Sequence, residues 1–423
     1  MNLELAKGVR DILPGEKILK EKVLEIIKRA FQLSGFVPLE TPTIERYETL
    51  AAKFGSGQES DALKETFKLK DQGGRKLGLR FELTTSLARF VANNPALKLP
   101  FKRYEFGRVF RDGPIKLGRY REFWQCDGDI IGSNSMLADA ECIAIIDSVF
   151  RKLEFAAVTK INNRKILNGI LSQAGITKPK DALIAIDKLD KIGVEGVSAE
   201  LKKKGYPDKQ VNGVFKLLSP GISLAELKTK LSGPEGKQGV DELSELIGYL
   251  KQMKIKYQFD VTLARGQAYY TGTVIESYLK NSSITSSIAG GGRYDKMIGG
   301  FMDNNREIPA VGISFGIEPI MDALKLSGKV TKKTEAKLLV IPIGTVPKSL
   351  EIAQQLRQAG IATDFALGKK GVSKSLEYAN ALGIAYVAII GEDELKKNKI
   401  LLKDMASGAE QLLTVGQVVG KLQ

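Results

Sequence analysis

The segment from Phe110 to Gln125 constrains the fold most, because it has the pattern of two strands joined by a loop. Before it, Tyr104 and Phe106 alternate with polar residues, as in a strand that buries one face. Gly113 and Pro114 then interrupt the pattern, and a second alternating run follows the loop. The chain is therefore expected to contain a hairpin of two strands in this region.

The second strand of this hairpin carries a concentration of functional groups. Side chains alternate along a strand, so residues two apart share a face. That face is formed by Arg121, Phe123, Gln125, Asp127 and Asp129. A cation, an amide and two carboxylates suit a ligand with an anionic end and a hydrogen-bonding end. Arg111 and Arg119 in the loop would add positive charge, although a polar face that is simply solvated remains an alternative.

Composition excludes several kinds of chemistry. The 423 residues include no histidine, so catalytic triads, imidazole bases and histidine-ligated metal sites are ruled out. Cys126 and Cys142 are the only cysteines, too few for a thiolate metal cage or a disulfide framework. Phosphoryl or nucleotidyl transfer fits the remaining residue types, because it depends mainly on positioning and charge stabilisation.

The charge balance favours a polyanionic partner. The formal net charge is +15 and the pI is about 9.4. The basic residues are spread along the chain, so a solvated surface is the more ordinary explanation for clusters such as Lys202–Lys204. No apolar run could span a bilayer, and the N-terminus lacks the features of a signal peptide. We therefore expect a cytoplasmic protein without a membrane partner.

Periodicity indicates how the first three quarters of the chain are organised. A helix is predicted over residues 16–34, an extended segment with two prolines over 36–42, and a second helix over 135–153. Short amphipathic helices with frequent Gly, Pro and Lys then cover about 162–250. Strand patterning resumes at 257–261, so the helical stretch is interpreted as an insertion.

A polar linker at 327–334 precedes a last segment in which strands and helices alternate. The order β-α-β-α-β predicts a small, mainly parallel sheet covered by helices. Its predicted strands are 338–341, 363–365 and 386–390, and its predicted helices are 349–359 and 373–382.

Glu82 and Thr84 form a second candidate group, at the end of the segment Arg80–Thr84. On an extended segment they would face the same way and could jointly accept hydrogen bonds from an ammonium group. The alternative is a helix N-terminus at which Thr84 or Thr85 caps and Glu82 is solvated.

Three later segments complete the set of candidate groups. Leu263–Thr273 contains Arg265 and two adjacent tyrosines, and Ala289–Asp295 contains three consecutive glycines that would let backbone approach a flat ring. Pro309–Pro319 has the pattern of an apolar strand that runs into a helix. Each segment also has a purely structural explanation, as core, turn or buried strand.

Together these segments resemble the histidyl-tRNA synthetases, a family of class II aminoacyl-tRNA synthetases. The helix at 16–34 with the extended segment 36–42 resembles motif 1, and residues 110–125 and 309–319 resemble motifs 2 and 3. Residues 263–273 and 289–295 resemble the two histidine-specific signatures. The resemblance implies an α+β catalytic domain with a mainly antiparallel sheet, a helical insertion and a C-terminal α/β anticodon-binding domain. The implied boundaries are 1–160 and 253–326 for the two parts of the catalytic domain, 161–252 for the insertion and 335–423 for the anticodon-binding domain.

The resemblance also implies roles for individual residues. Arg111 and Arg265 would be catalytic, one on each side of the ATP α-phosphate. The implied histidine-binding residues are Glu82, Thr84, Gln125, Asp129, Arg265, Tyr269, Tyr270 and Tyr294. The implied ATP-binding residues are Arg111, Arg119 and Gly316. ATP would be used with Mg²⁺, whose ligands are not identified, and the expected partners are histidine, the histidine tRNA and a second copy in a homodimer.

The chain departs from the usual family pattern at several positions. Gly113 and Pro319 stand where a glutamate and an arginine usually contact ATP, and Ala268 stands where an aspartate is common. Phe81 replaces a proline, and Asp129 is one methylene shorter than the usual glutamate. Loss of a charge-assisted contact weakens binding, so Arg119, Lys116 or Mg²⁺ would have to compensate.

These departures leave alternatives to an active histidine–tRNA ligase. One is a catalytically silent paralogue that binds histidine or tRNA in a regulatory role. The anticodon-binding domain argues against it, since the regulatory relatives lack that domain. Another is a general tRNA-binding protein, which would show salt-sensitive binding without dependence on ATP.

Overall fold

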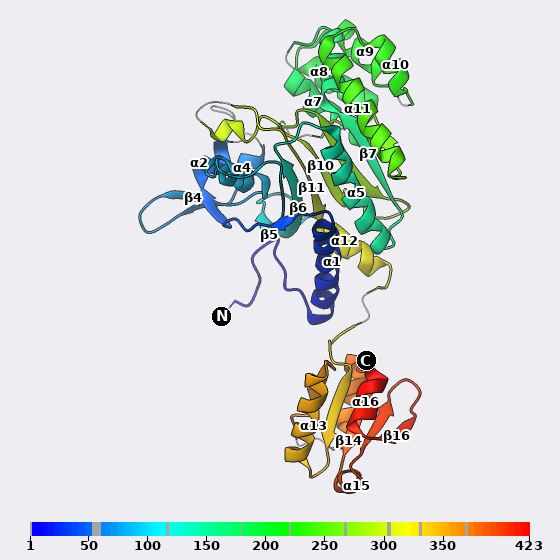
Figure 1. Cartoon of the computed structure of the whole chain (residues 1–423). Coiled ribbons are helices and arrows are strands. Elements are labelled where there is room, and N and C mark those ends of the chain that lie inside the picture. The colour runs from blue at the N-terminus through cyan, green and yellow to red at the C-terminus, as the bar shows by residue number, and fades with distance from the viewer. Residues whose placement is uncertain are drawn as a thin grey trace. The chain divides into compact units, whose positions relative to one another are not determined.

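The computed structural model describes residues 2–52, 61–115, 118–177, 179–219, 221–265, 269–302, 306–329, 332–368 and 371–423. The chain divides into two compact units. One comprises Met1–Arg10 and Val23–Leu326, and the other comprises Asp11–Lys22 and Ser327–Gln423 (Figure 1).

An eight-stranded sheet lies at the centre of the first unit, with the strand order β1-β5-β6-β11-β10-β9-β7-β8. The five inner pairs are antiparallel, whereas the outermost pairs, β1 with β5 and β7 with β8, are parallel. The strands are β1 (Val37–Pro38), β5 (Phe101–Phe110), β6 (Glu122–Ile131), β7 (Ala157–Asn163), β8 (Gln258–Phe259), β9 (Thr273–Leu279), β10 (Ala289–Arg293) and β11 (Ala310–Gly316). The predicted mainly antiparallel catalytic sheet is confirmed.

Strands β5 and β6 form the predicted hairpin, and their pairing runs from Phe101 with Ile131 to Phe110 with Glu122. Helices α1 (Pro14–Leu33) and α5 (Met136–Lys152) pack on one face of the sheet, where Phe31 and Phe150 both contact Phe315. Gly128 allows this close packing, since a Cβ there would lie 2.0 Å from the ring of Phe31. The opposite face, which carries Asp127 and Asp129, is left for the candidate site.

A small three-stranded sheet and several helices flank the large sheet. The small sheet contains β2 (Ile44–Arg46), β3 (Lys68–Lys70) and β4 (Lys76–Leu79) in the order β2-β4-β3. The helices are α2 (Tyr47–Ala52), α3 (Asp61–Lys64), α4 (Thr84–Ala92), η1 (Gly299–Phe301) and α12 (Ile317–Leu326). Leu87 and Val91 of α4 pack in one core with Ile131 and Tyr294, so α4 is anchored beside the candidate site.

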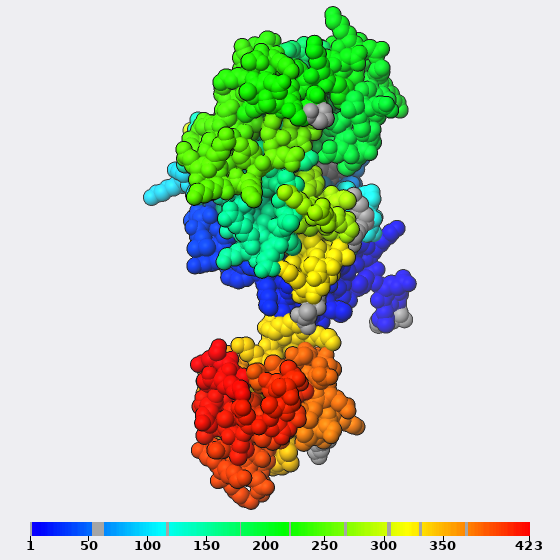
Figure 2. Space-filling model, turned by 90° about the vertical axis from the view of Figure 1, so that its right-hand side faces the viewer, coloured from blue at the N-terminus to red at the C-terminus, as the bar shows by residue number. Residues whose placement is uncertain are grey.

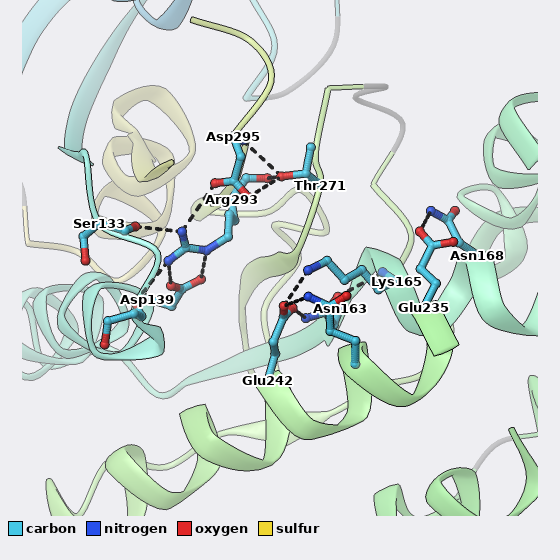
Figure 3. Close-up of polar contacts among 12 residues, drawn as sticks. Ser133, Asp139, Asn163, Lys165, Asn168, Glu235, Glu242, Thr271, Arg293 and Asp295 are labelled. Carbon is cyan, nitrogen blue, oxygen red and sulfur yellow. Dashed lines mark hydrogen bonds and ion pairs between the residues drawn. The ribbon is translucent and has the colours of Figure 1, made fainter. Parts of the chain in front are cut away.

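Between β7 and β8 the chain is helical, in agreement with the amphipathic pattern predicted for 162–250. The helices are α6 (Arg164–Gln173), α7 (Pro179–Ile186), α8 (Leu189–Lys203), α9 (Asp208–Leu217), α10 (Leu224–Lys230) and α11 (Pro234–Gln252). Glu242 of α11 joins them to the sheet, because it accepts hydrogen bonds from Asn163 Nδ2 at 2.9 Å and Lys165 Nζ at 2.5 Å (Figure 3). That residues 161–252 form a separate domain stays a prediction.

The second unit, coloured from yellow-orange to red in Figure 2, has a five-stranded sheet with the order β13-β12-β14-β15-β16. Its elements are β12 (Leu338–Pro342), α13 (Val346–Gln358), β13 (Thr363–Phe365), α14 (Val372–Leu382), β14 (Tyr386–Ile390), α15 (Glu392–Lys396), β15 (Ile400–Asp404), β16 (Glu410–Leu413) and α16 (Val415–Leu422). Ile352 of α13 and Val418 of α16 pack on one face, while Ala379 of α14 packs on the other.

The predicted β-α-β-α-β order is present here, but the expectation of a mainly parallel sheet needs correction. Strands β13, β12 and β14 are parallel, whereas β15 and β16 pair antiparallel at one edge. The sequence prediction lacks this hairpin and α16. Glu410 and Gln411 at the start of β16 are exposed, so an edge strand of this kind has little apolar alternation to identify it.

Candidate functional site

A cleft of about 860 Å³ lies over the uncovered face of the large sheet. Every residue that the sequence assigned to a site lies in its wall, although these residues come from segments far apart in the chain. They are Glu82, Thr84, Arg111, Arg119, Gln125, Asp129, Arg265, Tyr269, Tyr270, Tyr294 and Gly316. The individual roles given to them stay predictions.

Arg111, just after β5, contacts two aromatic rings. Its guanidinium carbon lies 4.3 Å from the centre of the Phe81 ring and 4.9 Å from that of Phe123, and its Nε donates to the Phe81 carbonyl at 3.3 Å. Burial lowers the pKa of Arg111, although the group remains a cation near neutral pH. Phe81, which replaces the usual proline, therefore stacks on this arginine and restricts its motion.

Arg265 reaches the cleft from an unusual backbone conformation, with a φ of 49°. Its Nη1 donates to the Ile275 carbonyl at 2.7 Å. The side chain crosses β10 at Gly290, where a Cβ would lie only 2.1 Å from Nη1. Burial acts to lower the pKa of Arg265, but the phenol of Tyr270 and the carboxylate of Glu276 outweigh it and raise the pKa. A permanent cation is thus fixed at this wall.

Glu82 and Thr84 do not lie on an extended segment, and the prediction that they do is wrong. Strand β4 ends at Leu79, and Thr84 is the first residue of α4, which has no side-chain cap. The alternative, a helix N-terminus with a solvated Glu82, is wrong about the solvation. Glu82 is only 4% exposed and accepts a hydrogen bond from Thr85 Oγ1 at 3.0 Å. The turn before α4 nevertheless brings both residues to the cleft.

Asp129 is tightly held at the floor of the cleft. Tyr294 donates its hydroxyl to Asp129 Oδ1 at 2.5 Å, and Arg103 Nη2 lies 2.8 Å from Oδ2. Its carboxylate lies across Gly312 of the next strand, where a Cβ would be 1.8 Å from Oδ1. Burial raises the pKa of Asp129, and the guanidinium of Arg103 opposes this shift.

Asp127 also lines the cleft but is absent from the sequence assignment. Burial raises its pKa to about 8, with Asp129 adding to the shift and Arg103 opposing it. The period-two pattern had placed Asp127 on the correct face with Gln125 and Asp129, so a signal for it was available. Arg121, which the pattern grouped with these residues, lies before β6 and not on the strand. It does not line the cleft, and its Nη1 pairs with Asp112 Oδ1 at 2.9 Å.

Glu65 lies beside the motif 2 loop, next to Arg119 of the cleft wall. Its Oε2 is 3.5 Å from Arg119 Nη2, and its carbonyl accepts from the Asp112 amide at 2.7 Å. A Cβ at Gly113 would lie 2.8–2.9 Å from the Glu65 carboxylate. Glu65 therefore occupies the space beside Gly113, and nothing in the local sequence pattern identifies it. Lys116 and Ala268 lie outside the described residues.

The remaining lining residues extend the site in two directions. Tyr269 and Tyr270 have ring centres 4.7 Å apart, and Tyr269 also meets Tyr294 edge to face at 6.1 Å. Gly316 and Pro319 both line the cleft, and a Cβ built at Gly316 would lie 3.4 Å from Pro319 Cγ. The helical insertion also contributes Asp187, Asp190 and Lys191, which sequence reasoning did not single out.

Arg293, which follows the three glycines, fixes the back of the site (Figure 3). It pairs with Asp139 of α5, and its Nη1 donates to the Ser133 carbonyl at 2.8 Å. Asp295 accepts from Thr271 Oγ1 at 3.1 Å, which links the two signature segments. This buried network determines where Tyr294 and the glycine strand lie.

No group of three or more Cys, Asp or Glu side chains among the described residues is arranged to hold a metal ion. Likewise, none of the described helices has both the length and the apolar character needed to cross a membrane.

Comparison with known proteins gives consistent matches along the whole chain. Residues 8–320 match the family described as histidyl-tRNA synthetase, and residues 337–423 match the anticodon binding domain. A protein of Bacillus cereus named histidine–tRNA ligase 1 is 44% identical over 97% of both chains. A Shouchella clausii protein named histidine–tRNA ligase 2 is 39% identical over 96% of both. The crystal structure of a histidyl-tRNA synthetase from Nostoc sp. PCC 7120 has a TM-score of 0.87 and 31% identity, and covers 100% of this chain and 99% of that one.

Proposed function

The chain belongs to the histidyl-tRNA synthetase family, and we propose that its cleft activates histidine with ATP and transfers the histidyl group to the 3′ end of the histidine tRNA. The observation that carries this proposal is the convergence of all eleven assigned residues on one cleft. Full-length relatives with the same name do not support the silent paralogue.

In the first step, a carboxylate oxygen of histidine attacks the α-phosphorus of ATP. The bond from that phosphorus to the bridging oxygen of pyrophosphate breaks, and histidyl-adenylate forms. Negative charge spreads over the oxygens of the reacting phosphoryl group, where fixed cations stabilise it. Arg111 and Arg265 suit this role because stacking and hydrogen bonding hold both guanidinium groups in place before the reaction.

Glu82, Thr84 and Gln125 would bind the α-ammonium group of histidine. Glu82 supplies a buried carboxylate, and Gln125 Oε1 is a buried acceptor without a partner among the described residues. An ammonium group brings three N–H donors, which matches a set of acceptors.

Asp129, Tyr294, Tyr269 and Tyr270 would enclose the imidazole ring. The tyrosines provide flat apolar walls with hydroxyl groups, and the pair of Asp129 and Tyr294 provides polar groups at the floor. Arg265 would contact the histidine carboxylate as well as the phosphate.

Arg119 and Gly316 would bind ATP, the latter by leaving a flat surface for the adenine. Mg²⁺ would enter with the triphosphate, held mainly by phosphate oxygens and water, and would neutralise their charge. This fits the absence of a cage of three acidic side chains from the described residues. Glu65 is well placed to support Arg119 where Gly113 has no side chain.

In the second step, a hydroxyl of the terminal tRNA ribose attacks the carbonyl carbon of the adenylate, and AMP leaves. The second unit would bind the anticodon, and the net charge of +15 favours a polyanion. A cytoplasmic homodimer is also proposed. Leu33, Val37 and Ile44, at or next to the motif 1 segment, are 70%, 48% and 50% exposed, as expected of a surface that a second copy covers.

ATP–pyrophosphate exchange with purified full-length protein tests the proposal. Exchange that depends on histidine, and not on other amino acids, would support it. A protein that bound histidine or tRNA without exchange would instead be a silent paralogue, and salt-sensitive tRNA binding without exchange would indicate a general tRNA-binding protein.

A further inference from the structure

Arg103 of β5 is a fully buried guanidinium next to the floor of the cleft. Its side chain is 0% exposed, and it is not part of the cleft wall. Its Nη2 lies 2.8 Å from Asp129 Oδ2, and its Nη1 lies 3.6 Å from Glu105 Oε2. None of its three nitrogen atoms makes a hydrogen bond to the residues that the structure describes. Ion pairing therefore holds this cation in place.

The pairing of β5 with β6 determines which groups surround Arg103. Arg103 stands directly opposite Asp129 in the sheet, and residues at such positions have side chains in contact on one face. Two residues further along, Glu105 stands directly opposite Asp127. Burial acts to lower the pKa of Arg103, but these three carboxyl groups outweigh it and raise the pKa. One guanidinium thus serves a group of three buried carboxyl groups.

Of these three groups, Glu105 is also held by other partners. Its Oε1 accepts hydrogen bonds from the Thr41 amide at 2.9 Å, from Thr41 Oγ1 at 2.7 Å and from Arg80 Nη1 at 3.0 Å. Asp129 Oδ2, by contrast, makes no hydrogen bond in the part of the chain that the structure describes, and its close contact is the ion pair with Arg103. Removal of the cation would therefore affect Asp129 more than Glu105.

The ion pair of Arg103 and Asp129 contributes little to folding by its geometry. Taking two opposite charges out of water is costly unless hydrogen bonds complete the pair, so uncharged replacements often leave stability unchanged or raise it. Arg103 makes no such hydrogen bonds to the described residues. A role in ligand binding accounts for this cation better than a role in stability.

Asp129 connects Arg103 to the cleft. Its Oδ1 accepts a hydrogen bond from the Tyr294 hydroxyl at 2.5 Å, and both residues line the cleft. Burial raises the pKa of Asp129, and Arg103 opposes that shift and so favours the ionised carboxylate. An ionised carboxylate accepts a hydrogen bond more strongly than a neutral carboxyl group does, which fixes the direction of the Tyr294 hydroxyl.

We propose that Arg103 is a positioning residue of the histidine site, which acts through Asp129 on the pocket for the imidazole ring. This inference rests on the proposed function, in which Asp129 and Tyr294 enclose that ring. Arg103 does not touch the ligand. It holds the Asp129 carboxylate in one direction, and through it the hydroxyl of Tyr294. A site that is arranged before the ligand enters loses less affinity to rearrangement.

Three variants of the full-length protein separate binding from folding. Arg103→Met removes the cation, Glu105→Gln removes the second carboxylate at the guanidinium, and the double variant removes both charges. Pyrophosphate exchange should show the KM for histidine raised about tenfold or more in both variants that lack Arg103, while the KM for ATP and the kcat stay within about twofold. Glu105→Gln alone should leave the KM for histidine unchanged, because Asp129 keeps its cation.

The melting temperature supplies the second readout. It should fall in Arg103→Met, where Glu105 and Asp129 lose their shared cation, and should recover in the double variant. The new amide oxygen at position 105 can still accept from Thr41 and Arg80. If Arg103→Met does not fold, the double variant decides. A double variant that also fails to fold would show that Arg103 is required for folding, and would overturn the inference.

Arg89→Met is the matched control. Arg89 of α4 pairs with Glu45 at 2.8 Å, and neither residue lines the cleft. Its loss should lower the melting temperature and leave the KM for histidine unchanged. The inference would be overturned if Arg89→Met raised this KM as much as Arg103→Met does. It would also be overturned if the double variant recovered the KM for histidine together with the melting temperature.

Calorimetric titration with histidine in the absence of ATP separates this inference from the proposed function. If the wild type binds histidine but gives no exchange, the proposed function fails, while a weaker affinity of the double variant would still support the role of Arg103. Equal affinities of the wild type and the double variant would overturn that role. Absence of histidine binding by the wild type overturns both.

Discussion

Replacement of Gly290 by alanine should impair catalysis without unfolding the protein. The new Cβ would lie 2.1 Å from Arg265 Nη1, whereas ordinary contact begins at 3.4 Å, so the guanidinium would retreat by about 1.3 Å. This atom is the end of a flexible side chain, so the strand itself need not move. The retreat would break the 2.7 Å hydrogen bond from Nη1 to the Ile275 carbonyl that holds Arg265 in place.

The magnitude follows from the displacement. Misplacement of a catalytic group by 1 Å typically costs about 100-fold in rate, which corresponds to about 2.7 kcal/mol of lost transition-state stabilisation. We therefore expect the kcat of histidine-dependent pyrophosphate exchange to fall about 100-fold in Gly290→Ala. Alanine loses less conformational freedom than glycine in a strand, so the melting temperature should stay unchanged or rise slightly.

Gly248→Ala in α11 is the matched control, since a Cβ there meets no atom within 4 Å. It should leave exchange unchanged. If Gly290→Ala retained exchange within about threefold of the wild type, with histidine and ATP near their usual KM values, the position assigned to Arg265 in catalysis would be refuted.

Three further predictions concern other buried or partly buried charges. The melting temperature of Asp127→Asn minus that of the wild type should grow with pH from about 4 to about 8 and then level off. In the folded wild type the Asp127 carboxyl group has a pKa of about 8, whereas in the unfolded chain its pKa is near 3.8, so the stability of the wild type falls as the pH rises between these values. A melting-temperature difference that did not change with pH would contradict the burial of an unpaired carboxyl group. Glu65→Ala should raise the KM for ATP several-fold, and addition of Gly113→Glu should restore part of it, since the new carboxylate enters the vacated space; no recovery in the double variant would argue against this support of Arg119. Arg293→Met should cost about 3–5 kcal/mol in urea unfolding, because Asp139 would remain buried without its cation, and addition of Asp139→Asn should recover much of that loss; a single variant as stable as the wild type would show that the pair is not structural.

Much of the fold and the list of site residues could be predicted from the sequence. Alternation placed Gln125, Asp127 and Asp129 on one face of a strand, and turn residues marked the loop that contains Arg111, because these are properties of neighbouring residues. The spacing of the motifs then identified side chains from distant segments that share the cleft. The edge hairpin β15–β16 was not predicted, since it has little apolar alternation.

The tertiary structure alone decided which partners these side chains have. It brought Glu65 into the space beside Gly113, placed the rings of Phe81 and Phe123 against Arg111, and paired Arg103 with Asp129 and not with Asp127. Such pairings join segments separated by tens of residues, and they depend on which atom fills a given space at atomic distance. Periodicity determines which face of a strand a residue occupies, but the partner across that face is set by close packing of the whole domain.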